Sequence, residues 1–187
     1  MLQGMTALPK PRMSVEDYLD WAIGRPGRYE LFRGEVFTMA PETSGHAEAK
    51  YAMQSALSSA IKRRNLACHM LPDGMTVRTE ADTAYEPDAL VYCGTKLPPS
   101  AVEVPEPMIL VEVLSPSGCR IDVSLKLAGY FGLPSVLHYL VLDTAKRLVI
   151  HHARGTGGTI LTRVVTEGTI ALDPPGLDIA LADIYGA

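Results

Sequence analysis

The chain has 187 residues, of which 47% are hydrophobic and 20% are charged, and its net charge is −4 at pH 7. This length and composition predict one globular domain over residues 1–187, with residues 1–12 poorly ordered. The acidic balance argues against a protein that coats nucleic acid electrostatically, but it leaves room for an enzyme with a local basic patch. No apolar run approaches the roughly 18 residues of a membrane span, so we expect a cytoplasmic protein without membrane contact.

The first half of the chain shows one helical and one hairpin pattern before a long helix. Ser14 and Asp17 form a capping-box pattern, and the helix that they begin ends near Gly24. Two short strands over 28–39 flank a turn at Gly34 and carry Glu30 and Glu35. Apolar residues spaced three and four apart then predict a helix over 46–65.

The rest of the chain alternates short apolar runs with one more helical pattern. The predicted elements are strands at 75–80, 86–93 and 108–114, a helix at 120–131, and strands at 137–143, 146–153, 160–165 and 168–172. The middle of the chain therefore reads as helix, three strands, helix and strand, which is an α/β arrangement.

The three cysteines are Cys68, Cys93 and Cys119. They are widely spaced and form no Cys-x-x-Cys pair, so the sequence suggests neither a disulfide framework nor a thiolate zinc site. We expect small, buried or half-buried side chains. The adjacent His151 and His152 face opposite sides of their strand, which argues against a joint metal site.

One carboxylate stands in the middle of an apolar run. Glu112 lies within Pro107–Ser117, which has the pattern of a strand that is buried on both faces. A charge in such a strand costs several kcal/mol unless something compensates it. Glu112 therefore needs a partner.

Asp88 is the first candidate partner, because it directly precedes another apolar strand. If the two strands are neighbours, the carboxylates of Asp88 and Glu112 can converge. Two converging carboxylates either share a proton or hold a cation, and oxygen ligands suit Mg²⁺ or Mn²⁺. Alone, Asp88 would be an ordinary turn residue after proline.

A basic residue completes this group of candidates. Asp122 and Lys126 lie four apart in the helix that follows the Glu112 strand, so they share a face and Lys126 could reach the same site. The competing interpretation is an exposed ion pair between the two, worth roughly 0.3–0.5 kcal/mol. That interpretation requires Lys126 to point at solvent.

Several short strings resemble the Uma-two family of restriction-endonuclease-like proteins, within the PD-(D/E)XK nuclease superfamily. The strings and residues are Tyr29-Glu30-Leu31, Gly34-Glu35, His46, Glu86-Pro87-Asp88, Val111 to Ser117, Asp122, Lys126, Tyr130 and Tyr139 to Asp143. The resemblance runs from about Ser14 to Asp143. It implies a restriction-endonuclease-like core, in which a mixed sheet is flanked by helices in the order αβββαβ, with an extra N-terminal helix and hairpin and extra C-terminal strands.

The chain departs from the superfamily pattern at one position. A lysine is expected two residues after Glu112, and that position is Leu114. In the Uma-two family the basic residue comes from the following helix, where Lys126 stands.

The resemblance implies a Mg²⁺-dependent (or Mn²⁺-dependent) endonuclease that acts on DNA, as a homodimer. Asp88 and Glu112 would hold the metal with Glu30 as a third carboxylate, and Lys126 would orient water or stabilise charge on the phosphate. His46 would contact phosphate or a metal ligand; alternatively, it caps its helix or faces solvent. The alternative function is a catalytically inactive module that binds nucleic acid or protein and retains the nuclease fold.

Overall fold

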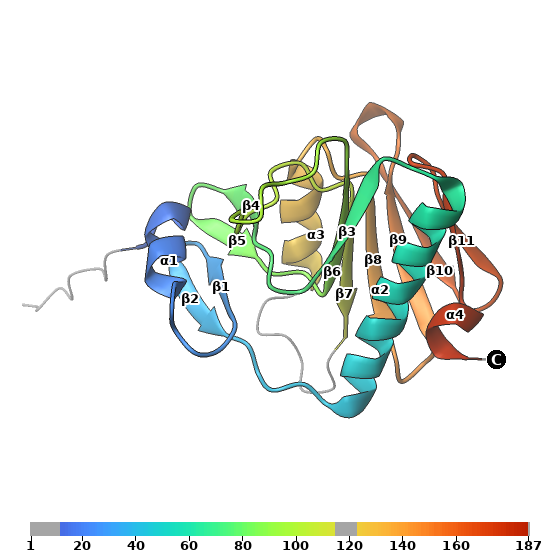
Figure 1. Cartoon of the computed structure of the whole chain (residues 1–187), viewed down its shortest axis with the longest axis horizontal. Coiled ribbons are helices and arrows are strands. Elements are labelled where there is room, and N and C mark those ends of the chain that lie inside the picture. Colours follow the sequence, from blue (N-terminus) through green and yellow to red (C-terminus); the bar gives the residue numbers. More distant parts are fainter. Residues whose placement is uncertain (1–11, 115–122, 187) are drawn as a thin grey trace, which may run out of the picture.

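A computed structural model describes residues 12–114 and 123–186 of the chain, which form two main β-sheets, a small hairpin and four α-helices (Figure 1). The larger sheet has six strands in the order β10-β9-β8-β7-β6-β3, and only its β7–β8 pair is parallel. Its strands are β3 (Cys68–Pro72), β6 (Ala89–Cys93), β7 (Ile109–Val113), β8 (His138–Asp143), β9 (Leu148–Arg154) and β10 (Ile160–Val165).

The remaining elements build the second sheet and cover the first. The four-stranded sheet has the order β2-β1-β5-β4, and its strands are β1 (Tyr29–Phe32), β2 (Glu35–Thr38), β4 (Val77–Glu80) and β5 (Thr83–Tyr85). Strands β11 (Thr169–Leu172) and β12 (Leu177–Ala180) form the hairpin. The helices are α1 (Val15–Ala22), α2 (Ser44–Arg64), α3 (Val123–Gly132) and α4 (Ala182–Tyr185).

Two hydrophobic cores lie on the two faces of the six-stranded sheet. On one face, the apolar side of α2 packs with β11, β12 and α4 against residues such as Val111 and Leu140. On the other face, α3 lies between the two sheets, where Tyr130 packs against Leu110, Val141 and Tyr85. Because strand residues alternate faces, Glu112 falls on the α3 side with Leu110.

Local sequence signals account for several boundaries. The Ser14 hydroxyl accepts a hydrogen bond from the backbone N–H of Asp17, whose carboxylate accepts one from the Ser14 N–H, so the predicted capping box begins α1. The turn of the first hairpin has positive φ at both Arg33 and Gly34, the geometry that fits the twist of a tight hairpin. The C-cap of α2 is Asn65 in the left-handed conformation.

The predicted α/β class is confirmed, but one of its strands lies elsewhere. The segment predicted as a strand at 75–80 forms β4 of the smaller sheet, and the edge of the larger sheet is β3. No strand was predicted over Cys68–Pro72, where Pro72 is a turn signal, and proline is tolerated there only because β3 is an edge strand. The short β5 was also missed.

The expectation that the cysteines form no disulfide was wrong. Cys68 and Cys93 stand directly opposite each other on β3 and β6, with 3.9 Å between their Cα atoms, and form a disulfide bond. A separation of 25 residues in sequence gives no sign of this pairing, which arises from the register of the two strands. Cys119 lies outside the described residues.

The C-terminal third extends and covers the larger sheet. Strands β9 and β10 add to its edge, whereas β11, β12 and α4 pack on the α2 side. His151 and His152 do point to different partners: His151 Nε2 lies 2.9 Å from Nδ1 of His138, and His152 Nδ1 lies 2.8 Å from Oγ1 of Thr162. Within residues 12–114 and 123–186, no helix is long and apolar enough to cross a membrane.

Candidate active site

Lys126 lies between two carboxylates that come from different sheets. Its ammonium group donates hydrogen bonds of 2.8 Å to Oε1 of Glu30 on β1 and of 2.8 Å to Oε1 of Glu112 on β7. Lys126 is only 3% exposed. The interpretation of Lys126 as a member of an exposed surface pair is therefore wrong, and Asp122, its other expected partner, lies outside the described residues.

Tyr130 lies one helical turn after Lys126 and contacts the same acceptor. Its hydroxyl donates a 2.8 Å hydrogen bond to Oε1 of Glu112. The Tyr130 ring is fully buried and packs edge-on against the rings of Tyr85 and Tyr139. The Lys126 ammonium also lies 5.4 Å from the centre of the Tyr85 ring, within the range of a cation–π contact. Aromatic side chains thus fix both donors to Glu112.

Burial and the neighbouring charges together determine the pKa of Glu112. Burial raises its pKa to about 7, and the nearby charges of Glu30 and Asp88 act in the same direction while Lys126 opposes them. The pKa of Lys126 is raised well above its usual value, since the attraction of the two carboxylates outweighs the effect of burial. The Lys126 side chain is a fixed positive charge at the centre of the site.

Asp88 lies beside Glu112, at the start of the neighbouring strand. Ala89 pairs with Val111, so the antiparallel register brings Asp88 opposite Glu112. The Asp88 N–H donates to the carbonyl of Val111 at 2.9 Å, and the Val113 N–H donates to Oδ2 of Asp88 at 2.8 Å. The side chain of Gln54 on α2 holds the Asp88 carbonyl at 2.8 Å. The backbone around Asp88 is therefore anchored on two sides.

His46 is buried in the first turn of α2 and faces Asp88. Its Nε2 lies 3.5 Å from Oδ1 of Asp88, and its backbone N–H donates to the capping hydroxyl of Thr43. Contact with the Asp88 carboxylate raises the pKa of His46. Burial would raise the pKa of Asp88, but the contacts with His46 and the Val113 N–H outweigh it and the pKa is lowered. The solvent-facing interpretation of His46 is therefore wrong.

A network of ion pairs lies on the outer side of the Asp88–His46 pair. Arg28 Nη1 lies 2.6 Å from Glu42 and 3.0 Å from Asp73, and Lys50 lies 2.5 Å and 3.0 Å from the same two carboxylates. Arg28 Nε also donates to Glu86 at 2.7 Å. The network joins the segments that flank Asp88 and His46 to the start of β1.

The donor atoms present fit a divalent cation. Glu42, His46 and Asp88 each offer one ligand atom, and these atoms all lie within 4.8 Å of one another. Nδ1 of His46 is buried and has no hydrogen-bond partner among the described residues. Carboxylate oxygens together with one imidazole can ligate a divalent cation. In this structure Glu112 and Glu30, the other two expected ligands, are instead held by Lys126.

All five residues selected from the sequence thus lie in two adjoining groups, Lys126 with Glu30 and Glu112, and Asp88 with His46. Sequence reasoning assigned no role to Tyr130, Gln54 or Glu42. Tyr130 lies four residues after Lys126 on the same helix, and this spacing could have indicated that the two side chains reach the same site. Glu42 lies in a loop, where an acidic residue gives no signal.

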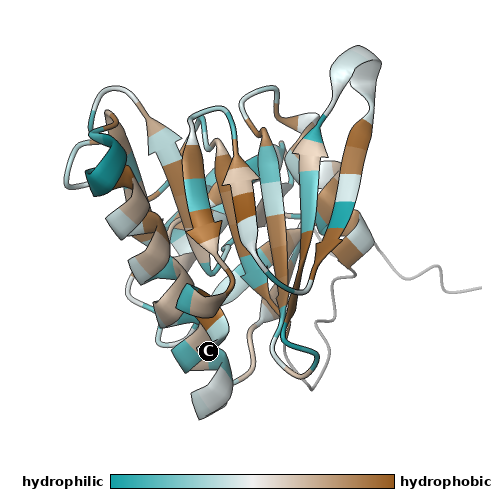
Figure 2. Cartoon of the chain, turned by 90° about the vertical axis from the view of Figure 1, so that its right-hand side faces the viewer, coloured by the Kyte–Doolittle hydropathy of each residue, from teal (hydrophilic) through white to brown (hydrophobic). Residues whose placement is uncertain are grey.

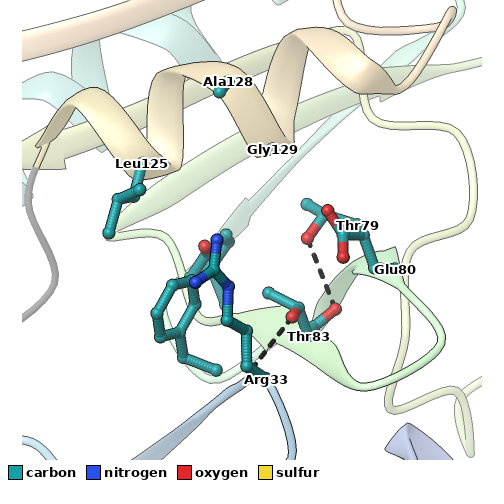
Figure 3. Close-up of a pocket in the computed structure, with 9 residues that line it drawn as sticks. Arg33, Thr79, Glu80, Thr83, Leu125, Ala128 and Gly129 are labelled. Atoms are coloured by element: carbon teal, nitrogen blue, oxygen red, sulfur yellow. Dashed lines mark hydrogen bonds between the residues drawn. The ribbon is translucent and has the colours of Figure 1, made fainter.

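A small pocket of about 150 Å³ lies next to this site, between α3 and the four-stranded sheet. Tyr85 lines it and also contacts Lys126. Figure 3 shows Leu125, Ala128 and Gly129 on one side and Arg33, Thr79 and Thr83 on the other. The Arg33 N–H donates to the Thr83 hydroxyl, and the Thr79 hydroxyl donates to the Thr83 carbonyl. These bonds fix the floor of the pocket.

A mixed sheet flanked by helices, with buried acidic residues at adjoining strands and a lysine from the next helix, is the arrangement that the resemblance to restriction-endonuclease-like proteins predicted. The chain belongs to the Uma2 family, described as "Putative restriction endonuclease", which matches residues 15–182. The family predicted from the sequence is thereby confirmed.

Two similar proteins extend this comparison. An uncharacterized protein of Synechocystis sp. is 23% identical over 187 residues, which cover 99% of this chain and 97% of the relative. A crystal structure from Anabaena variabilis, described as "a putative nuclease belonging to DUF820", matches with a TM-score of 0.74 and 15% identity. That match covers 92% of this chain and 97% of the solved one, and it confirms the fold.

Proposed function

We propose that this protein is an endonuclease that depends on Mg²⁺ or Mn²⁺ and hydrolyses phosphodiester bonds in DNA. Membership of a family described as restriction endonucleases supports a nuclease. The observation that carries the proposal is the buried Lys126, which two carboxylates hold beside the Asp88–His46 pair. A purely structural core has no need of five ionisable side chains at one place, because burying charge costs free energy.

Asp88 and Glu112 are the residues that we propose as metal ligands, with Glu30, His46 and Glu42 in support. A bound divalent cation would neutralise charge on the phosphate and make the water bound to it more acidic. The Val113 N–H and the Gln54 side chain hold Asp88 in place through its carboxylate and its carbonyl. Tyr130 does the same for Glu112 by binding one of its two oxygens.

Lys126 has two roles in this proposal. Without substrate it balances the charges of Glu30 and Glu112, which would otherwise repel each other. With a phosphodiester in place, its ammonium would donate to a phosphate oxygen and stabilise the charge that builds up there. The aromatic contact with Tyr85 keeps the ammonium near this position.

The test is metal-dependent nicking of supercoiled plasmid, with single-stranded RNA as a second substrate. Wild-type protein should nick the plasmid in Mg²⁺ or Mn²⁺ and stop when the metal is chelated. Asp88→Asn, Glu112→Gln and Lys126→Ala should each lower the rate by about 100-fold or more. Glu35→Gln, which neutralises an exposed carboxylate on β2, is the matched control and should nick normally.

Calorimetry with Mg²⁺ alone separates the enzyme from an inactive module. Wild-type protein should bind the cation, and Glu112→Gln should lose at least part of that binding. A folded protein that neither binds Mg²⁺ or Mn²⁺ nor cuts DNA would contradict the proposal. Cleavage of RNA without cleavage of DNA would retain the nuclease and overturn the substrate.

A further inference from the structure

We infer that β10, at the edge of the six-stranded sheet, is the surface through which two copies of this chain associate. The inference does not depend on the nuclease proposal, because it rests only on the side chains and register of this strand. It gives the expected homodimer a specific interface.

Exposed apolar side chains are concentrated on β10. Ile160 is 38% exposed, Leu161 54% and Val164 60%. They are three of the seven large hydrophobic residues found exposed in the described residues. In Figure 2, β10 is the outermost strand, below the pale hairpin, and it is mostly brown with one teal band. A single strand of six residues thus carries much of the exposed hydrophobic surface.

Edge strands of monomeric proteins are usually protected by charge, proline, a bulge or a covering element. Strand β10 pairs with β9 over six consecutive residues without a bulge, contains no proline and has one charged residue, Arg163. The opposite edge, β3, is shorter, ends at Pro72 and is tied to β6 by the disulfide. Among the described residues the two edges of the same sheet therefore differ, and β10 is the longer edge, with five of its six residues exposed.

Symmetry restricts how two β10 strands can pair. When a two-fold axis perpendicular to the sheet relates two antiparallel strands, corresponding faces of the two strands stay on the same side of the sheet. An even-numbered residue therefore lies directly opposite an even-numbered residue of the second copy, and an odd-numbered residue opposite an odd-numbered one. A register centred on Arg163 would place two arginines opposite each other, which is unfavourable. A register centred on Thr162 instead pairs Ile160 with Val164 of the second copy, and Arg163 with Leu161. The Thr162 register is the one we propose.

This register favours a second copy over an unrelated strand. The two-fold axis repeats the Ile160–Val164 contact on each side of the centre, so both exposed apolar residues of this face are covered by one partner. Backbone hydrogen bonds along the edge add to these contacts. Because six-residue strands give a small interface, we expect a dissociation constant on the order of micromolar.

The first test is sedimentation velocity of the full chain at concentrations from about 1 to 200 µM. Wild-type protein should form a dimer of twice the chain mass. Val164→Lys should weaken association by about tenfold or more, because it places a charge against Ile160 of the second copy. Ile23→Lys is the matched control, since Ile23 is 74% exposed at the end of α1, and it should dimerise as wild type does.

The second test reads the register directly. Directly opposed residues in adjacent strands have Cβ atoms about 5 Å apart, which suits a disulfide after slight adjustment. Oxidised Thr162→Cys should therefore give a covalent dimer on a non-reducing gel. Arg163→Cys should give much less, because its counterpart in the second copy lies diagonally. Both variants are compared with wild type, which has its own cysteines, and both are checked for folding by thermal melting.

Three outcomes would overturn the inference. The first is wild-type protein that stays monomeric across the whole range, and the second is equal dimerisation of Val164→Lys and Ile23→Lys. A covalent dimer through residue 163 and none through residue 162 would reject the Thr162 register.

Discussion

The ammonium group of Lys126 lies 2.8 Å from Oε1 of Glu112, in the interior between two sheets. Lys126 comes from α3, which follows the Glu112 strand, so the lysine and the carboxylate lie only 14 residues apart in sequence. This pairing answers the need for a counter-charge that the apolar surroundings of Glu112 create.

Removing the Lys126 charge should destabilise the protein. Lys126→Met leaves Glu30 and Glu112 buried without their cation, so we expect the free energy of unfolding at pH 7 to fall by roughly 3–5 kcal/mol. The measurement is urea denaturation. Lys146→Met removes a lysine whose side chain is 74% exposed, and it should change stability by no more than about 0.5 kcal/mol. Equal stability of the two variants would mean that Lys126 does not neutralise the carboxylates.

Tyr130→Phe should separate positioning from packing. The ring stays between Tyr85 and Tyr139, but Glu112 loses one donor. We expect Mg²⁺ affinity and nicking to fall by about 10- to 100-fold, as for other residues that orient a metal ligand. Tyr185→Phe is the control, because its hydroxyl bonds to the Leu148 carbonyl away from the site. Unchanged Mg²⁺ binding by Tyr130→Phe would remove this positioning role.

The His138–His151 pair should make stability depend on pH. Burial lowers the pKa of His151 to about 4, helped by the neighbouring His138, Arg163 and His152, and burial also lowers the pKa of His138. Both groups bind protons more readily in the unfolded chain, so their contribution is complete above pH about 6.5 and declines as the pH falls toward 4.

Thermal melting between pH 7.5 and 4.5 measures this decline. The melting temperature of wild type should fall with acidification, and His151→Gln should flatten that fall. His69→Gln, on β3, is the control and should retain the wild-type slope. Identical slopes for the His151 and His69 variants would show that the pair does not determine acid sensitivity.

Reduction of the disulfide should lower stability without removing the site. A crosslink that closes a loop of 25 residues restricts the unfolded chain, which corresponds to about 3.5 kcal/mol in the chain-entropy account. Cys68→Ala with Cys93→Ala should show this loss in urea denaturation, and reductant should then have no further effect. Wild-type protein whose stability is insensitive to reductant would contradict the prediction.

The sequence predicted which ionisable side chains lie together better than it predicted the sheets. A lone carboxylate in an apolar strand requires a partner wherever the strand lies, so the sequence alone was enough to single out Glu112. Lys126 could be proposed as its partner because it lies on the next helix. The assignment of strands to sheets depends on long-range pairing. The residues of β4 do not indicate that it pairs with β5 and not with β6. Pro72 is a turn signal at the end of β3, so it gave no indication of a strand there. Glu42 was missed because its position depends on how the loop before α2 folds against Arg28.

Glu30 belongs to the N-terminal sheet, whereas its partner Lys126 belongs to a helix that also packs on the larger one. The proposed active site is therefore complete only when both halves of the chain have come together. In a chain in which residues 12–40 have not yet docked, Lys126 has only one of its two carboxylate partners, so the proposed activity would depend on completion of the fold.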